Sequence, residues 1–195
     1  EDPKSKTLIE NIKKQLHDEP NRKIVIFTEY IDTVKHLSER LNSAFDGRVL
    51  SIAGNMVGKI EDINKNFDAT YEKQADKYDI LLCTDKISEG FNLNRAGMVI
   101  NYDIPWNPVR VIQRIGRINR ISKKVFDELY IVNFFPTELG ANEMKSREIA
   151  SIKMFHIHNI LGEDAKIFAI DEVPTPSGLY DKLKQNPDYL EQESF

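Results

Sequence analysis

"DILLCTDKISEGFNL", residues 79–93, joins a short apolar run to a polar segment. Two more apolar runs of this kind are KIVIFT at 23–28 and ELYIVNFF at 128–135. All three contain continuous apolar residues instead of a strict alternation, which is typical of strands buried on both faces of a parallel sheet. The sequence therefore predicts an α/β fold built around such a sheet.

Shorter strand patterns and amphipathic helical patterns lie between these runs. The further strands are expected at RVLSI, 48–52, and MVINYD, 98–103, and the helices at 30–41, 58–77 and 107–118. In the first helix Val34, Leu37 and Leu41 share one stripe with Ile31. Strands that alternate with helices predict crossover connections, and hence a sheet with helices on both faces.

This alternating region is expected to form the central domain, residues 20–136. Residues 1–19 are predicted as a lead-in helix, and 137–195 as a helical extension with a tail rich in Pro, Asp and Glu. The extension contains one long helical pattern at 141–162.

Composition limits the classes of function. The net charge of −4 argues against coating of nucleic acid by bulk electrostatics, so any such contact is expected to be local. No window approaches the length of a membrane-spanning segment, so no membrane partner is expected. The single cysteine, Cys83, favours a reducing compartment, and the cytoplasm is the predicted location. A chain that starts at Glu1 instead of Met is expected to be part of a longer protein.

The segment AGNMVGKIED, 53–62, looks like a phosphate-binding loop but lacks two of its requirements. Gly54 and Gly58 are one residue too close, and Ile60 replaces the hydroxyl that binds magnesium. A glycine-containing turn into a helix is the better interpretation. The chain also offers no metal site, because it has one cysteine and four scattered histidines. No serine or cysteine stands beside a convincing base.

Four arginines lie within RVIQRIGRINR, residues 110–120, with no acid between Asp103 and Asp127. On a helix they cover roughly a third of the circumference. A solvated helix face is the ordinary interpretation, but such a face usually interleaves Glu with Arg. Gly116 suggests the close approach of another backbone or of a ligand. Uncompensated arginines beside this glycine favour a phosphate-binding site.

Polar side chains follow two of the predicted strands. The segment after 79–84 holds Thr84, Asp85, Ser88, Glu89, Gly90 and Asn92, and Thr28 ends the first strand. In open α/β sheets, ligands bind beyond the carboxyl ends of the strands. Helix capping by Thr28 or Thr84 is the alternative for either strand end alone.

Three segments, in order and spacing, resemble motifs IV, V and VI of superfamily 2 helicases. They are KIVIFTEYIDTVKHLSERL, DILLCTDKISEGFNLNRAGMVINYD and IPWNPVRVIQRIGRINRIS. The pairing of INYDIPWNP with QRIGRINR is most similar to the Swi/Snf-like branch and its bacterial relatives. The resemblance spans residues 20–136 and is weakest at 46–68, where Lys59 and Lys65 stand in place of the usual arginine.

The resemblance implies a second RecA-like lobe, together with roles for individual residues. Arg120 matches the arginine finger and Arg117 its companion, whereas Arg110 and Arg114 match no fixed nucleotide contact. ATP contacts fall on Gln113, Gly90 and Asn92, and nucleic-acid contacts on Thr28, Thr84 and Lys59. The first lobe of the parent chain, which would hold the phosphate loop and Mg²⁺, is the implied partner.

Together these observations predict the C-terminal lobe of an ATP-dependent DNA helicase or translocase, inactive on its own. RNA is the alternative nucleic acid. Two other classes stay open from the sequence: the nucleotide-sugar lobe of a two-lobed glycosyltransferase, and an interaction domain whose arginines dock an acidic partner.

Overall fold

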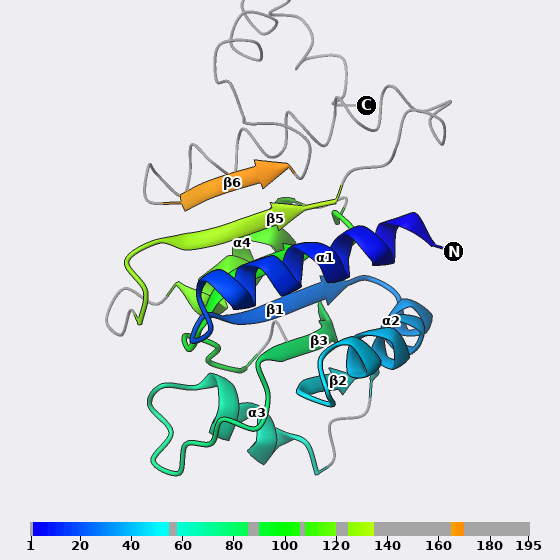
Figure 1. Cartoon of the computed structure of the whole chain (residues 1–195). Coiled ribbons are helices and arrows are strands. Elements are labelled where there is room, and N and C mark those ends of the chain that lie inside the picture. Colours follow the sequence, from blue (N-terminus) through cyan, green and yellow to red (C-terminus); the bar gives the residue numbers. More distant parts are fainter. Residues whose placement is uncertain are drawn as a thin grey trace, which may run out of the picture.

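The structure is a computed structural model, and it describes residues 2–54, 58–85, 90–105, 108–119, 125–134 and 165–169. Six parallel strands form one sheet in the order β2-β3-β1-β4-β5-β6 (Figure 1). The strands are β1 (Lys23–Thr28), β2 (Val49–Ile52), β3 (Ile80–Thr84), β4 (Ala96–Asn101), β5 (Leu129–Asn133) and β6 (Ala165–Ala169). The five predicted strands are confirmed.

The strand β6 was not expected, because residues 165–169 lie in the segment predicted as a helical extension and tail. It pairs in parallel with β5 over five residues, from Leu129↔Ala165 to Asn133↔Ala169. A strand from the predicted extension therefore adds to the sheet of the central domain. The predicted helix at 141–162 lies outside the described residues.

Helices cover both faces of the sheet, as the alternating pattern predicts. Within the described ranges the helices are α1 (Pro3–Asp18), α2 (Ile31–Ala44), α3 (Ile60–Phe67) and α4 (Pro108–Ile118). Figure 1 shows α1 and α2 in front of the sheet and α4 behind it. Strand side chains alternate between the faces, so Val25 and Phe27 pack on the α4 side while Ile24 and Ile26 pack on the α1 side.

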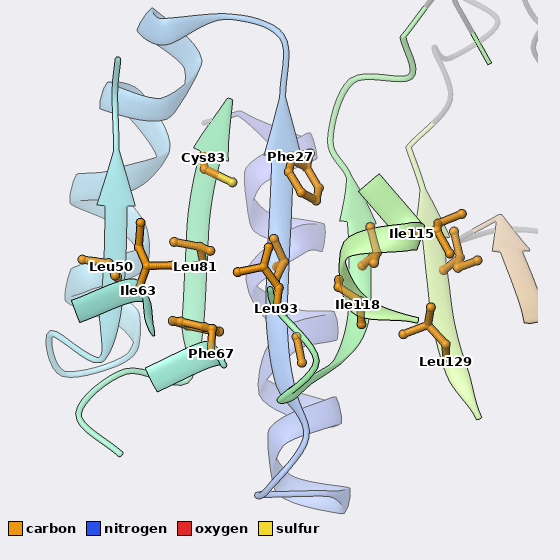
Figure 2. Close-up of a cluster of buried hydrophobic side chains, with 14 of the residues drawn as sticks. Phe27, Leu50, Ile63, Phe67, Leu81, Cys83, Leu93, Ile115, Ile118 and Leu129 are labelled. Carbon is orange, nitrogen blue, oxygen red and sulfur yellow. The ribbon is translucent and has the colours of Figure 1, made fainter. Parts of the chain in front are cut away.

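The two faces hold separate apolar cores. On one face, Ile63 and Phe67 of α3 and Ile115 and Ile118 of α4 cover the central strands (Figure 2). On the other face the cover comes from α1 and α2, through Leu8, Ile12, Val34, Leu37 and Leu41.

The helix α1 is part of the second core. Its residues Leu8 and Ile12 are fully buried against the sheet, and Asp2 caps it by accepting a hydrogen bond from the Lys4 backbone N–H at 3.0 Å. Residues predicted only as a lead-in therefore cover the same sheet as α2.

The helix predicted at 58–77 is much shorter, because α3 ends at Phe67. The Asp68 carboxylate accepts from the backbone N–H and hydroxyl of Thr70, which turns the chain away from the helix axis. The Asn66 side chain then accepts from the backbone N–H groups of Lys77 and Tyr78. Polar side chains thus fix residues 68–78 in an irregular segment.

Candidate nucleotide and nucleic-acid interface

Parallel strands bring polar residues together at the carboxyl edge of the sheet. Thr28 of β1 is in register with Thr84 of β3, and Asn101 of β4 with Asn133 of β5. All four side chains are buried. The two asparagines were missed from the sequence, although each ends an apolar strand and so carries the same signal as the threonines.

Helix α4 contributes Arg114 to this edge, and its side chain is fully buried. Its Nε and Nη2 donate to the two carboxylate oxygens of Asp85 at 2.5 and 2.8 Å, and Nη1 donates to Asn101 Oδ1 at 2.7 Å. The guanidinium also lies over the Phe27 ring, 5.0 Å from its centroid. A bidentate pair of this kind is the strongest geometry for an arginine and a carboxylate.

Arg110 lies one turn earlier on α4 and is about half exposed. Its Nη1 is 3.5 Å from Asp85 Oδ2 and 3.6 Å from Glu29 Oε1. The expectation that the arginine cluster is uncompensated is therefore wrong for Arg110 and Arg114. Their acids come from the ends of β1 and β3, which are distant in sequence, and Arg114 has no free face for a phosphate.

Arg117 and Gln113 differ from these two. Gln113 is exposed and Arg117 is partly exposed. Neither side chain hydrogen-bonds another residue within the part of the chain that the structure describes. Arg120 lies outside the described residues. Gly116 is exposed, and a Cβ at this position would meet no atom of the described residues within 4 Å, so none of them accounts for that glycine.

The segment after β3 approaches α4 through its backbone. The Leu93 N–H donates to the Arg117 carbonyl oxygen at 2.9 Å. Gly90 is exposed with a φ of 95°, a conformation that favours glycine. Asn92 Nδ2 donates to Asp68 at 2.8 Å, while Asn92 Oδ1 is buried and accepts no hydrogen bond from the described residues. The predicted ATP contacts Gly90 and Asn92 thus lie on a segment that contacts the helix of the third, Gln113. Ser88 and Glu89 lie outside the described residues.

The predicted nucleic-acid contacts are not equally available. Thr28 is fully buried and its hydroxyl donates to the Asp103 carboxylate, which also pairs with the Lys4 ammonium at 3.1 Å. Lys59 Nζ donates to the Ser51 carbonyl oxygen at 2.6 Å. Thr84, 6% exposed, has no side-chain hydrogen bond to a described residue. Thr28 is not the N-cap of α2, because that position is Tyr30; the Thr28 hydroxyl accepts from the Tyr30 backbone N–H, at 3.4 Å, before the helix begins.

Other chemistry finds little support here. Gly54 and Gly58 have positive φ and precede α3, which fits the turn predicted in place of a phosphate loop. Burial raises the pKa of the Cys83 thiol, so this cysteine is a poor nucleophile at neutral pH. Over the described ranges, no cluster of three His, Cys, Asp or Glu side chains suits a metal ion, and no helix has the length and apolar content to cross a membrane.

The chain is similar to several helicases. An uncharacterised ATP-dependent helicase of Bacillus subtilis, YqhH, is 36% identical over 102 residues, which are 52% of this chain and 17% of that protein. The DEAD-box ATP-dependent RNA helicase 10 of Arabidopsis thaliana is 33% identical over 108 residues, 55% of this chain and 22% of that protein. The chain therefore spans less than a quarter of the length of these relatives.

The crystal structure of the Escherichia coli DEAD-box protein SrmB has the same fold, with a TM-score of 0.57 at 18% identity. The match covers 88% of this chain and 90% of that one. The fold is RecA-like, as the resemblance implied. The family model described as the helicase conserved C-terminal domain matches residues 4–122. Because that match covers more than half of the sequence, this chain belongs to the helicase conserved C-terminal domain family.

Proposed function

We propose that this chain is the second lobe of an ATP-dependent helicase or translocase and completes an ATPase site shared with a first lobe. The bond between the Leu93 N–H and the Arg117 carbonyl supports this proposal most directly. It joins the segment with Gly90 and Asn92 to the helix with Gln113 and Arg117, which supports a single site for the predicted ATP contacts. Family membership leaves the nucleotide-sugar alternative without support.

The residues fit a nucleotide in two respects. Asn92 Oδ1 is a buried acceptor without a hydrogen bond from the described residues, and a ribose hydroxyl supplies the missing donor. The Arg117 guanidinium, partly exposed and without a described side-chain partner, suits phosphate oxygens. The segment 53–62 lacks the features of a phosphate loop, so the first lobe is proposed to hold the β- and γ-phosphates and Mg²⁺.

The proposed chemistry is electrostatic. Phosphoryl transfer spreads negative charge over oxygens, and a guanidinium that reaches in from a second body stabilises that charge. Arg120 is proposed as this finger and Arg117 as its companion. Because both belong to a lobe separate from the phosphate loop, turnover requires the lobes to close. Closure and reopening of the two lobes can then shift the nucleic-acid contacts of this lobe along a nucleic-acid strand.

The nucleic-acid contacts are proposed at the ends of β1 and β3. The Thr28 hydroxyl already donates to Asp103 and offers a phosphate only acceptor lone pairs, whereas the Thr84 hydroxyl donates to none of the described residues. Thr84 is therefore the stronger candidate of the two. Lys59 must release the Ser51 carbonyl before its ammonium reaches a phosphate.

The choice between DNA and RNA rests on two different observations. The motif pairing in the sequence resembles the Swi/Snf-like branch, which favours DNA. The name of the Arabidopsis relative, an RNA helicase, favours RNA. We propose single-stranded DNA as the first ligand to test, with RNA of the same sequence as the direct competitor.

The decisive experiment compares this chain alone with the two-lobed enzyme, meaning this chain joined to the first lobe of its parent protein. We expect no ATP turnover from the chain alone and Mg²⁺-dependent turnover, stimulated by nucleic acid, from the two-lobed enzyme. Hydrolysis by the isolated chain that Arg120→Ala abolishes would contradict the shared site. Stimulation by RNA alone would contradict the choice of DNA.

A further inference from the structure

The side chain of Arg114 contacts the ends of several strands of the sheet. Its three guanidinium nitrogens engage Asp85, which follows β3, and Asn101, which ends β4. Nη1 also lies 3.4 Å from the Asp103 carbonyl oxygen, and the ring of Phe27, from β1, lies beneath the plane. One side chain of α4 is thus held by the ends of the three central strands.

The contact extends to a fourth strand through an amide. Asn101 accepts from Arg114 with Oδ1 and donates from Nδ2 to Asn133 Oδ1 at 2.8 Å. The planar fork of Arg114 therefore has one orientation in which the carboxylate and the amide are both satisfied. A helix held only by Val111, Ile115 and Ile118 lacks this restriction, because apolar contacts are not directional.

Stability alone does not account for a buried ion pair at this place. Removing two charges from water costs more than their attraction often returns, and apolar replacements of equal volume are commonly neutral or stabilising. A buried pair is best attested as a device that fixes one arrangement among several. Here the arrangement that it can fix is the rotation of α4 about its own axis.

We propose that Arg114 is a positioning residue, and that the buried Arg114–Asp85 pair sets the rotation of α4 and so the place of Arg117 in the shared ATPase site. The proposal rests on the function proposed above. Arg117 follows Arg114 by three residues, so rotation of the helix moves both side chains together. A misplacement of about 1 Å is enough to lower turnover by about 10²-fold.

The first test measures helix orientation in this chain without any activity. Spin labels are placed at Gln113→Cys on α4 and Glu39→Cys on α2, both exposed and on opposite faces of the sheet, while the fully buried Cys83 stays unlabelled. The probe variant is Arg114→Met with Asp85→Leu, which removes both charges together.

We expect a narrow distance distribution when Arg114 and Asp85 are present and a broadened or shifted one in the double variant. The melting temperature of the double variant should be equal to or higher than that of the chain with Arg114 and Asp85. A distribution that stays narrow and unshifted overturns the proposal, whatever the activity of the complete enzyme.

The second test measures kinetics in the two-lobed enzyme. The double variant is expected to lower kcat by about 10²-fold while KM for ATP changes little, because the first lobe holds most ground-state contacts. Arg114→Lys is expected to rescue poorly, since an ammonium lacks the planar fork. The matched control is Arg22→Met, which removes a buried guanidinium at the other end of the sheet and should leave kcat of the folded enzyme unchanged.

The outcomes separate this proposal from the function on which it rests. If the two-lobed enzyme without substitutions turns over ATP and the double variant has the same kcat, the positioning role is wrong and the proposed function stands. If the parent enzyme shows no turnover, the proposed function fails, and the spin-label distances then decide the positioning role by themselves.

Discussion

Each end of the sheet buries an arginine, but the partners differ. At the amino edge, Arg22 lies between the rings of Phe126 and Tyr130, with centroids 4.5 and 4.1 Å from its guanidinium carbon. Its Nη1 donates to the backbone carbonyls of Gly97 at 3.1 Å and Glu128 at 2.7 Å. At the carboxyl edge, Arg114 is held chiefly by side chains.

This difference separates a structural edge from a functional one. Backbone carbonyls cannot leave their strands, so these two bonds tie Arg22 to the beginnings of β4 and β5, and its Nε also donates to the Glu19 carboxylate. The partners of Arg114 are carboxylate and amide side chains, which are not fixed by the strand backbone and therefore depend on one another for their positions. We therefore expect changes at the amino edge to alter stability and changes at the carboxyl edge to alter turnover.

The largest expected effect concerns Arg120, the proposed arginine finger, which lies outside the described residues. In the two-lobed enzyme, Arg120→Ala should lower kcat by about 10³-fold or more, the range known for arginine fingers. ATP binding should suffer less, because the finger acts mainly on transition-state charge. Arg110→Ala is the control and should be much milder, since Arg110 only pairs loosely with Glu29 and Asp85. Equal losses from the two variants would reduce the arginine cluster to a general basic face.

A glycine at the amino edge should give the next largest effect. A Cβ on Gly97 would lie 2.6 Å from Arg22 Cγ and 2.9 Å from Phe126 Cδ2. Gly97→Ala must displace Arg22 or the ring, at a cost of about 1–3 kcal/mol in the free energy of unfolding. Denaturant unfolding of this chain measures the loss. If Gly97→Ala also lowered kcat of the folded two-lobed enzyme, the separation of the two edges would be wrong.

The matched glycine on α4 should respond in the opposite direction. Gly116 is within the helix and exposed, and among the described residues no atom outside the helix backbone lies within 4 Å of where its Cβ would be. Gly116→Ala should therefore raise the free energy of unfolding by about 0.5–1 kcal/mol, because alanine favours the helix. A loss of stability would show that a neighbour of α4 needs the space. The same denaturant titration serves both glycine variants.

The smallest expected effect is the acid sensitivity of the amino edge. Asp76 pairs with Lys23 at 3.1 Å and with Arg95 at 2.5 Å, and the hydrogen bond from Lys23 lowers the pKa of Asp76 below 3.8. The pKa of Lys23 is lowered as well, because burial outweighs the pairing at that side chain.

A lowered carboxyl pKa contributes stability that is present above 3.8 and is lost as the pH falls through the folded value. Asp76→Asn should thus flatten the fall in stability below pH 3.8 slightly, since Asp76 is largely exposed. Thermal melts of both proteins across that range measure the change. Identical pH profiles would contradict a role for the pair.

Particular residues show why the sequence predicted the strands better than the site. The run KIVIFT predicts β1 because burial on both faces demands an apolar residue at nearly every position, which is a local pattern. The partners of Arg114 are not local: Asp85 lies 29 residues earlier and joins it only through the strand order. The arginine segment itself contains no acid, so its sequence suggests an open phosphate site, although Arg114 is in fact buried in an ion pair. The sequence shows Asn101 and Asn133 at the ends of two apolar strands, but the hydrogen bond between them depends on the β4–β5 register, which no local pattern reveals.

The strand order also governs how the chain can assemble. β1 pairs with β3 and β4, and the next strand in sequence, β2, does not touch it. Until β3 has been synthesised at residues 80–84, β1 has no strand partner, and its second edge stays unpaired until β4 follows at residues 96–101. Non-local pairing of this kind slows folding, and unpaired strand edges promote aggregation. Among the described strands, β1 therefore waits longest, counted in residues, for pairing on both of its edges.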